Sequence, residues 1–390
     1  MNVLIFQGFV DPEGRRGEAL LEAWPTLPGV AGAIARAGCA VQVVVAARRD
    51  EQVETDGVVY RFVAERVFPS PRRLLGHRAA PHPVRSLHAV AALRPDAVHL
   101  HGLSFPRQAR TLRRLHPEAA LLVQDHADRP PVGWRRRLHK WGYQGVDGAA
   151  FTAPALAFPF LQAGILPNGV QVFGVLEGSS RFTPGDRDAA RRELGLEGDP
   201  LVAWMGNLTV GKDPATALEA FRHALEELPG ATLCMVYLGG ELEAEIRARV
   251  SRDPALASRV RLLGALAHPR VETFLRGADA LLAPSRREGS GYALIEALAC
   301  GTPAVVSSIP SHRAILGARG AGVVAPMGDA AAMGRGLAQV VRGGAAARVA
   351  ARRRFEEGLT FDRIGIQLHD AYRAMLARKA LGAATAGDVP

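Results

Sequence analysis

Two glutamates eight positions apart, Glu288 and Glu296, flank a glycine-containing segment in the second half of the chain. An apolar run at 280–283 precedes the segment and another at 304–306 follows it, so the order is strand, loop, helix, strand. Ser290 is the expected N-cap, and Gly301 suits the turn that ends the helix. The first-turn amides of that helix are unpaired and carry the positive end of its dipole, which favours an anion such as phosphate. The two carboxylates are placed to frame one such ligand.

This stretch resembles the nucleotide-sugar site of the family-four retaining glycosyltransferases. The family signature places two glutamates eight positions apart in a Glu-Gly-x-Gly…Glu-Ala-x-Ala-x-Gly-x-Pro setting. The matching positions are Glu288, Gly289, Gly291, Glu296, Ala297, Ala299, Gly301 and Pro303. The alternative is an ordinary strand–helix–strand unit with surface glutamates. The resemblance implies a GT-B fold and transfer of a glycosyl group from a nucleoside diphosphate, with retention of anomeric configuration.

The segment from Gly206 to Pro214 resembles a second part of that family's donor site, in which an arginine and a lysine hold the diphosphate. Lys212 matches the lysine, and its ammonium would neutralise charge on the leaving group. The arginine position is occupied by Asn207. An amide can still donate to a phosphate oxygen. The diphosphate would then be held by Lys212, the amides from Gly289 to Tyr292, and Arg286 or Arg287.

The resemblance also implies the remaining donor contacts. Glu296 would accept hydrogen bonds from the two ribose hydroxyls, and Glu288 would position the donor sugar. Main-chain groups at Gly264 and Leu266 would contact the base, which leaves uracil, guanine and adenine open. The expected donor-binding set is Gly206, Asn207, Lys212, Arg287, Glu288, Gly289, Ser290, Gly291, Tyr292, Glu296, Gly264 and Leu266.

Residues of the first half resemble the family's acceptor side. The run 96–102 ends in His101-Gly102, and 122–126 ends in Asp125-His126. His126 at a strand end would hydrogen-bond a sugar hydroxyl or the departing phosphate, which makes it a catalytic candidate beside Glu288 and Lys212. The alternative is a surface histidine whose hydrogen bonds are satisfied without a ligand. Gly8 opens the loop that corresponds to the family's glycine-rich acceptor loop. No Asp-x-Asp metal motif is evident in the donor segments 206–214 and 284–303, so we expect no metal and no cofactor beyond the nucleotide sugar.

Composition limits the class of protein. The 390 residues are 48% hydrophobic, and no window is apolar enough to span a membrane. No signal peptide is visible, and three unpaired cysteines suit a reducing compartment, so we expect a cytoplasmic protein. The positive charge behind the net +10 is almost all arginine, which indicates a compositional bias rather than a binding device, so we expect no nucleic-acid partner.

One basic cluster, residues 134–141, carries two tryptophans beside three arginines and a lysine. Such a helix suits peripheral contact with the anionic inner face of a membrane, because tryptophan settles at headgroup level. The alternative is a solvated helix face.

Apolar runs alternate with helical segments along the whole chain, which predicts parallel sheets covered by helices on both faces. The fold class is therefore α/β, with two doubly wound Rossmann-like domains facing each other across a cleft. We expect an N-terminal acceptor-side domain over 1–180, a nucleotide-sugar domain over 187–360, and a flexible tail over 382–390. A last helix over 361–379 would pack back on the first domain. The predicted strands are 3–6, 40–46, 58–63, 96–101, 119–124, 150–152, 170–175, 200–205, 231–238, 260–263, 280–283 and 304–306.

Three rival functions remain at this point. A nucleotide-sugar epimerase shares the architecture but needs no acceptor. A catalytically degenerate sugar-nucleotide-binding protein is favoured by Asn207 and would show no donor turnover. A nucleic-acid binder rests on charge alone and would show steep salt dependence.

Overall fold

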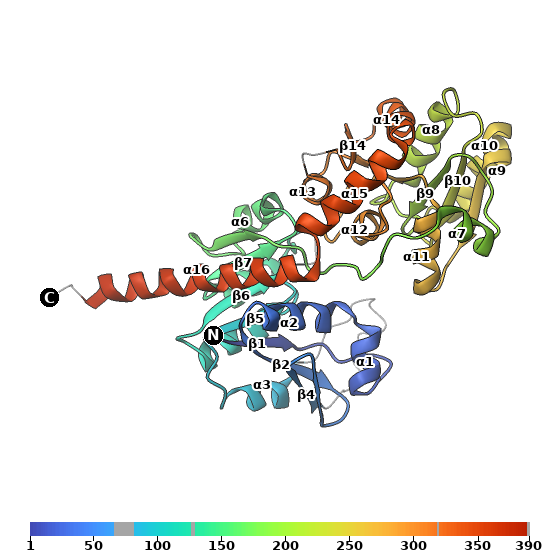
Figure 1. The fold of residues 1–390 in the computed structure, drawn as a ribbon. Coiled ribbons are helices and arrows are strands. Elements are labelled where there is room, and N and C mark those ends of the chain that lie inside the picture. Colours follow the sequence, from blue (N-terminus) through green and yellow to red (C-terminus); the bar gives the residue numbers. More distant parts are fainter. Residues whose placement is uncertain (66–81, 126–128, 318–319, 388–390) are drawn as a thin grey trace. The chain divides into compact units, whose positions relative to one another are not determined.

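The computed structural model describes residues 1–65, 82–125, 129–317 and 320–387, with side chains up to residue 381. The chain divides into two units. The first comprises Met1–Gly178 with Phe361–Pro390, and the second comprises Ser179–Thr360 (Figure 1). Each unit has its own sheet and its own hydrophobic core.

The described strands of the first unit form an eight-stranded sheet in the order β3-β4-β2-β1-β5-β6-β7-β8. All neighbours are parallel except β3 and β4, which form an antiparallel hairpin at one edge. Strand order reverses direction between β1 and β5, which makes this the topological switch point. The strands are β1 (Asn2–Gln7), β2 (Ala40–Ala47), β3 (Glu51–Thr55), β4 (Val58–Ala64), β5 (Ala97–His101), β6 (Ala120–Gln124), β7 (Gly148–Phe151) and β8 (Gln171–Gly174).

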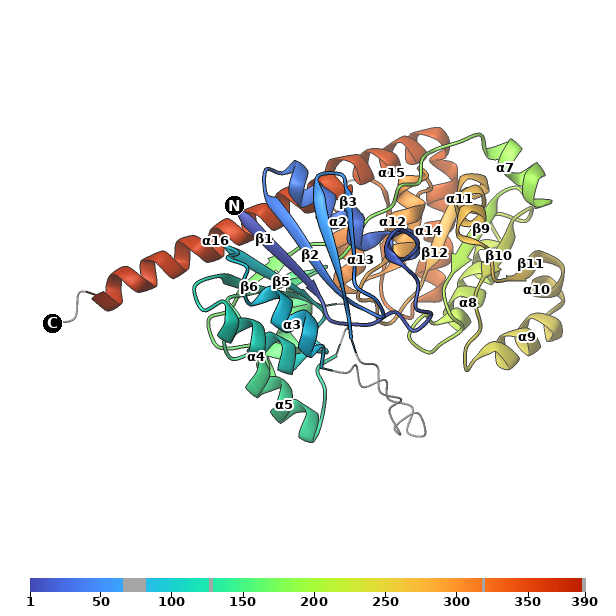
Figure 2. The same ribbon diagram turned by 90° about the horizontal axis from the view of Figure 1, so that it is seen from below.

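Helices cover both faces of this sheet because its central strands are buried on both sides. Figure 2 shows α2 and α16 on one side and α3 and α4 on the other. The described helices are α1 (Gly17–Ala23), α2 (Thr26–Arg36), α3 (Val84–Val90), α4 (Pro106–Leu115), α5 (Trp134–Gly142), α6 (Phe158–Gln162) and α16 (Phe361–Gly387), with a 3-10 turn at Pro154–Ala157.

The second unit has a six-stranded, fully parallel sheet in the order β11-β10-β9-β12-β13-β14. Its strands are β9 (Leu201–Met205), β10 (Thr232–Val236), β11 (Val260–Gly264), β12 (Ala280–Ala283), β13 (Ala304–Ser307) and β14 (Gly322–Ala325). Its described helices are α7 (Arg187–Leu194), α8 (Pro214–Ala224), α9 (Glu243–Arg252), α10 (Pro254–Arg259), α11 (His268–Gly277), α12 (Tyr292–Ala299), α13 (Pro310–Leu316), α14 (Ala330–Arg342) and α15 (Gly344–Gly358).

Both predicted parallel sheets are confirmed, and three details differ from the expectations. Strands β3 and β14 were not predicted, because β3 is polar and β14 is only four residues long. The last helix, α16, is longer than 361–379 and takes in residues 382–387, which were expected to be a tail. That stretch is rich in alanine, the strongest helix former, so the helix continues through it.

No helix in the described part of the chain combines the length and the apolar character needed to cross a membrane. The three cysteines are buried and free.

Candidate functional site

The donor-site residues predicted in the second unit lie in loops at one edge of its sheet. Strands β9, β12 and β13 are neighbours and parallel, so the loops that follow them emerge at the same carboxyl edge. The loop after β9 runs from Gly206 to Asp213, and the loop after β12 runs from Pro284 to Gly291. Ligands of doubly wound sheets bind at this edge.

Lys212 and Glu288 form an ion pair that joins the two loops. Both side chains are mostly buried, with 28% and 14% exposed, so solvent screens the pair only partly. The other Glu288 oxygen accepts a hydrogen bond of 3.3 Å from the Gly291 amide. A charged carboxylate and an ammonium therefore meet at the amino end of α12.

A second set of contacts fixes these loops to each other. The amides of Arg286 and Arg287 lie 2.9 and 3.3 Å from the Gly211 carbonyl oxygen. The Arg286 side chain donates to Asp213 at 2.7 Å, and Asp213 in turn accepts from the Thr216 amide and hydroxyl as the N-cap of α8. These hydrogen bonds hold together the two loops that carry Lys212 and Glu288.

Glycines of these loops meet neighbours at close range. A Cβ on Gly206 would lie 3.2 Å from Lys212 Cγ and Cδ, so the lysine stem lies over this backbone. A Cβ on Gly291 would overlap Ile315 Cδ1, and Gly291 has φ +73°. Gly291, rather than the predicted Ser290, is the N-cap of α12. The left-handed conformation at this position is open to glycine but costly for serine.

Glu296 lies inside α12 and is largely buried, with 13% of its side chain exposed. Its Oε1 is 3.2 Å from His268 Nε2 at the start of α11. Burial raises the pKa of the Glu296 carboxyl, and His268 opposes the shift. A buried carboxylate with one neutral or cationic neighbour is suited to accept hydroxyl groups.

His312 at the start of α13 is a component that sequence reasoning missed. Its Nδ1 lies 3.2 Å from the Ser307 carbonyl oxygen, and the Ser307 hydroxyl donates to the Ser285 carbonyl. Burial lowers the pKa of His312 to about 4, while nearby Glu288 opposes the shift. A neutral His312 therefore braces the end of β13 beside the ion pair. The sequence carries no signal for it, since one histidine in a short helix is unremarkable.

The other predicted donor residues lie around this centre. Asn207 is exposed at the end of β9, and the Arg287 guanidinium passes near Gly211, 3.8 Å from where a Cβ would stand. Gly289 and Ser290 fill the loop before α12, and Tyr292 is its first residue. Gly264 ends β11, and Leu266 follows it, two strands away from β9 in the sheet.

The predicted acceptor-side residues lie in the first unit. Gly8 follows β1, and its carbonyl oxygen lies 3.3 Å from Gln108 Nε2. His101 ends β5, is buried, and stacks on His99 with ring centroids 4.5 Å apart. Asp125 follows β6, whereas His126 lies outside the described residues.

Among the described residues, no three His, Cys, Asp or Glu side chains come together as they would to hold a metal ion.

Comparison with known proteins identifies the second unit. Residues 186–357 match the family model described as glycosyl transferases group 1. The D-inositol 3-phosphate glycosyltransferase of Actinosynnema mirum is 35% identical over 153 residues, which cover 37% of this chain and 35% of the relative. The enzyme of the same name from Mycobacteroides abscessus is 36% identical over 134 residues, covering 33% of this chain and 29% of the relative. The chain thus spans about a third of the length of the curated relatives it matches.

Solved structures match nearly the whole chain at low identity. Sucrose-phosphate synthase of Thermosynechococcus elongatus has a TM-score of 0.66 at 19% identity, covering 97% of this chain and all of that one. The catalytic domain of starch synthase IV from Arabidopsis thaliana, solved with ADP and acarbose, has a TM-score of 0.69 at 13% identity, covering 96% and 99%. These likenesses show the fold, which is GT-B. Within this fold, residues 186–357 of the second unit match the glycosyl transferases group 1 family.

Proposed function

We propose that this protein transfers a glycosyl group from a nucleoside diphosphate sugar to an acceptor, with retention, in glycan, glycolipid or polysaccharide assembly. The observation that carries the proposal is the Lys212–Glu288 pair at the amino end of α12. Lys212 and the α12 amides would stabilise the charge that builds on the departing diphosphate. Glu288 would hold hydroxyls of the donor sugar, and Glu296 the ribose.

Asn207 supports the alternative, a sugar-nucleotide-binding protein without turnover. Two observations favour the transferase. The Arg287 guanidinium lies near Gly211, next to Lys212 in the sequence, so the loops bring a second cation close to Lys212. Structural neighbours solved with UDP or ADP have the same fold.

We expect turnover without a divalent ion, so EDTA should leave the rate of nucleoside diphosphate release unchanged.

Thermal shift with nucleotides tests the donor site. UDP, GDP and ADP and their sugar conjugates are added to the full chain at about 100 times Kd. The matching nucleotide should stabilise the fold by about 2.7 kcal/mol, which raises the melting midpoint by roughly 5–10 °C. Lys212→Ala and Glu296→Ala should abolish the shift. Lys140→Ala, which removes a lysine of the first unit, should keep it.

The result then decides between the two functions. A shift followed by release of the nucleoside diphosphate in the presence of acceptor supports the transferase. A shift without any turnover, including slow donor hydrolysis, would instead establish the degenerate binder. The absence of a shift with every nucleotide would reject the donor site.

We further propose that the protein is cytoplasmic and that α5 binds peripherally to the anionic inner face of a membrane. Trp134 is 67% and Trp141 44% exposed, and the basic side chains at 135–137 and 140 are exposed on the same helix. Vesicles of phosphatidylglycerol should bind the protein in flotation, whereas phosphatidylcholine vesicles should not. Trp134→Ser should weaken this binding several-fold, and Arg353→Gln in the second unit should not. Equal binding to both kinds of vesicle would contradict charge recognition.

A further inference from the structure

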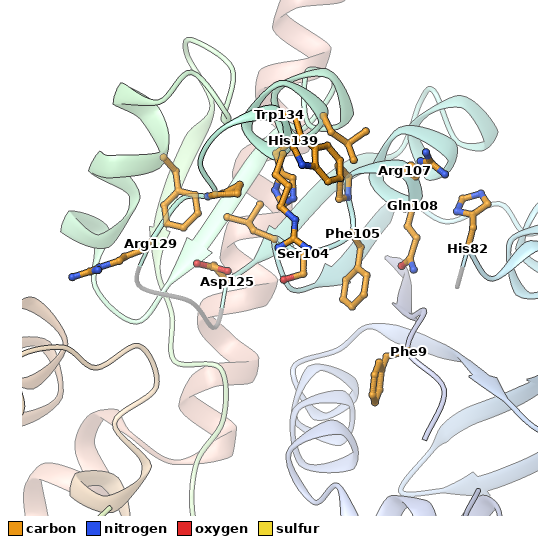
Figure 3. A pocket seen from close by; sticks show the side chains of 16 residues that line it. Phe9, His82, Ser104, Phe105, Arg107, Gln108, Asp125, Arg129, Trp134 and His139 are labelled. Atoms are coloured by element: carbon orange, nitrogen blue, oxygen red, sulfur yellow. The ribbon is translucent and has the colours of Figure 1, made fainter. Parts of the chain in front are cut away.

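A cavity of about 670 Å³ lies in the first unit, and all of its described lining residues belong to that unit. Its walls come from segments that follow β1, β5 and β6, and from α4, α5 and α6 (Figure 3). It therefore lies at the carboxyl edge of the first sheet, next to the switch point between β1 and β5. Volume and position are those of a ligand site in a doubly wound domain.

The walls of this pocket are mostly apolar and largely aromatic. In Figure 3, Phe105 lies in the middle of the lining and Phe9 approaches from the β1 loop. The apolar lining residues are Phe9, Leu103, Phe105, Pro106, Pro131, Trp134, Leu138 and Phe160. Aromatic walls of this kind favour a hydrocarbon or the apolar face of a ring.

The charged groups of the pocket are mainly cationic. Arg107, Arg129 and Arg135 line it, and Asp125 is the single acid among the described lining residues. In Figure 3, Arg129 lies on one side and Arg107 on the other, with Asp125 between. Burial lowers the pKa of His139 to about 4, with Arg135 adding to the effect, so this imidazole is neutral at pH 7. Three guanidinium groups against one carboxylate leave an excess of positive charge.

The amino end of α4 adds to this positive charge. The helix begins at Pro106 and has no side-chain cap, so the amides of its first turn remain without helical partners. Gln108, in that first turn, is 3% exposed, and its Oε1 has no hydrogen-bond partner among the described residues. A buried amide oxygen of this kind is suited to accept a ligand hydroxyl.

We propose that this pocket takes the acceptor, and that the acceptor is a phosphorylated molecule with an apolar or ring-shaped body and a free hydroxyl. The inference rests on the proposed function, because it gives the acceptor of that same reaction. The aromatic walls contact the apolar or ring-shaped body, and Arg107 and Arg135 bind the phosphate. Gln108 Oε1 accepts a hydrogen bond from the hydroxyl. Guanidinium is the preferred protein partner of phosphate because its planar fork matches two oxygens.

Titration calorimetry of small probes with the full chain, in the absence of donor, tests the acceptor class. The probes are octyl phosphate, octyl glucoside, inorganic phosphate and glucose 6-phosphate. Octyl phosphate or glucose 6-phosphate should bind at least about tenfold more tightly than inorganic phosphate and octyl glucoside, since each control lacks one of the two features. Preference for octyl phosphate assigns the phosphate to a lipid, and preference for glucose 6-phosphate assigns it to a soluble sugar.

Matched arginine variants locate the binding. Arg107→Gln in α4 and Arg135→Gln in α5 should each weaken binding of the phosphorylated probe about tenfold. Arg114→Gln and Arg137→Gln, on the same two helices but outside the lining, should leave it unchanged. Equal losses for lining and control variants would overturn the proposal in favour of unspecific charge. Octyl glucoside binding as tightly as octyl phosphate would also overturn it.

The nucleotide shift keeps this inference separate from the proposed function. If the phosphorylated probes fail while UDP, GDP or ADP still raises the melting midpoint, the acceptor class is wrong and the donor site stands. If the probes bind and no nucleotide does, the pocket stands as a phosphate-ester site and the transfer reaction fails.

Discussion

Glu296 costs the folded protein stability when it is charged. Burial raises the pKa of its carboxyl group, and the His268 imidazole only partly opposes the shift. A raised pKa in the folded state means that the stabilising effect of protonation is present at low pH and is lost as the pH rises through that pKa. At neutral pH, the buried negative charge of Glu296 therefore lowers the stability of the folded protein. A ligand-binding role accounts for such a residue, because strained or costly groups concentrate at functional sites.

Glu296→Gln should separate binding from stability. At pH 7.5 the variant should melt at a higher temperature than the parent protein, because the buried charge is removed. This advantage should shrink as the pH falls through the raised pKa of the parent carboxyl, where the parent takes up its proton. Nucleotide binding should weaken about tenfold, since an amide accepts ribose hydroxyls less well than a carboxylate. Melting curves over pH and a nucleotide titration measure both effects.

Glu245→Gln on the exposed face of α9 is the matched control, and it should change neither property. A Glu296→Gln variant that melts lower at every pH would mean that its contact with His268 is mainly structural.

At the scale of the single element, the start of helix α12 depends on Gly291. Its φ of +73° and the contact with Ile315 leave no room for a side chain, and its amide donates to Glu288. Because α12 directs its amino end at the proposed diphosphate site, the geometry of this one residue controls where the helix dipole points.

Gly291→Ala should cost more than the ordinary penalty for a left-handed residue. Gly195, after α7, has φ +63° with open space around it, so Gly195→Ala should lower stability by only about 1–2 kcal/mol. Gly291→Ala should exceed this loss and also weaken nucleotide binding. Adding Ile315→Val, which removes the clashing Cδ1, should restore part of both. Denaturant unfolding and thermal shift provide the comparison. Equal effects of the two alanine variants would show that the contact with Ile315 is unimportant.

The two units should unfold as separate cooperative blocks at the scale of the whole molecule. Each has its own sheet and core, and α16 belongs to the first although it follows the second in sequence. Within the first unit, the buried Tyr372 hydroxyl of α16 lies 2.7 Å from His99 Nδ1 in β5. Residues more than 270 positions apart are thereby joined across one core.

Scanning calorimetry should resolve two transitions. The matching nucleotide should raise only the transition of the second unit, by mass action. Tyr372→Phe should lower only the other transition, by about 1–2 kcal/mol, because His99 loses a buried hydrogen bond. Tyr237→Phe in the second unit removes a hydroxyl that has no hydrogen-bond partner among the described residues, so it should have little effect. A single transition that both the nucleotide and Tyr372→Phe shift would show that the units unfold together.

The repeated apolar strands determined the fold class, because a strand buried on both faces must be apolar along its whole length. Thus 97–101 and 120–124 were predictable, whereas the polar edge strand Glu51–Thr55 was not. The Asp56-Gly57 turn, with both residues at positive φ, was the signal that could have found that hairpin. Edge strands face solvent, so hydrophobic pattern says little about them.

The sequence by itself also determined which residues are candidates at the donor site. The spacing of Glu288 and Glu296 on a loop and a helix, with Lys212 in the loop after β9, follows from local signals and strand order. Only the tertiary structure decided that Lys212 and Glu288 pair, that Gly291 rather than Ser290 begins the helix, and that His312 lies beside them. These contacts join separate loops, and their strength depends on burial and approach distance, which no local stretch of sequence encodes.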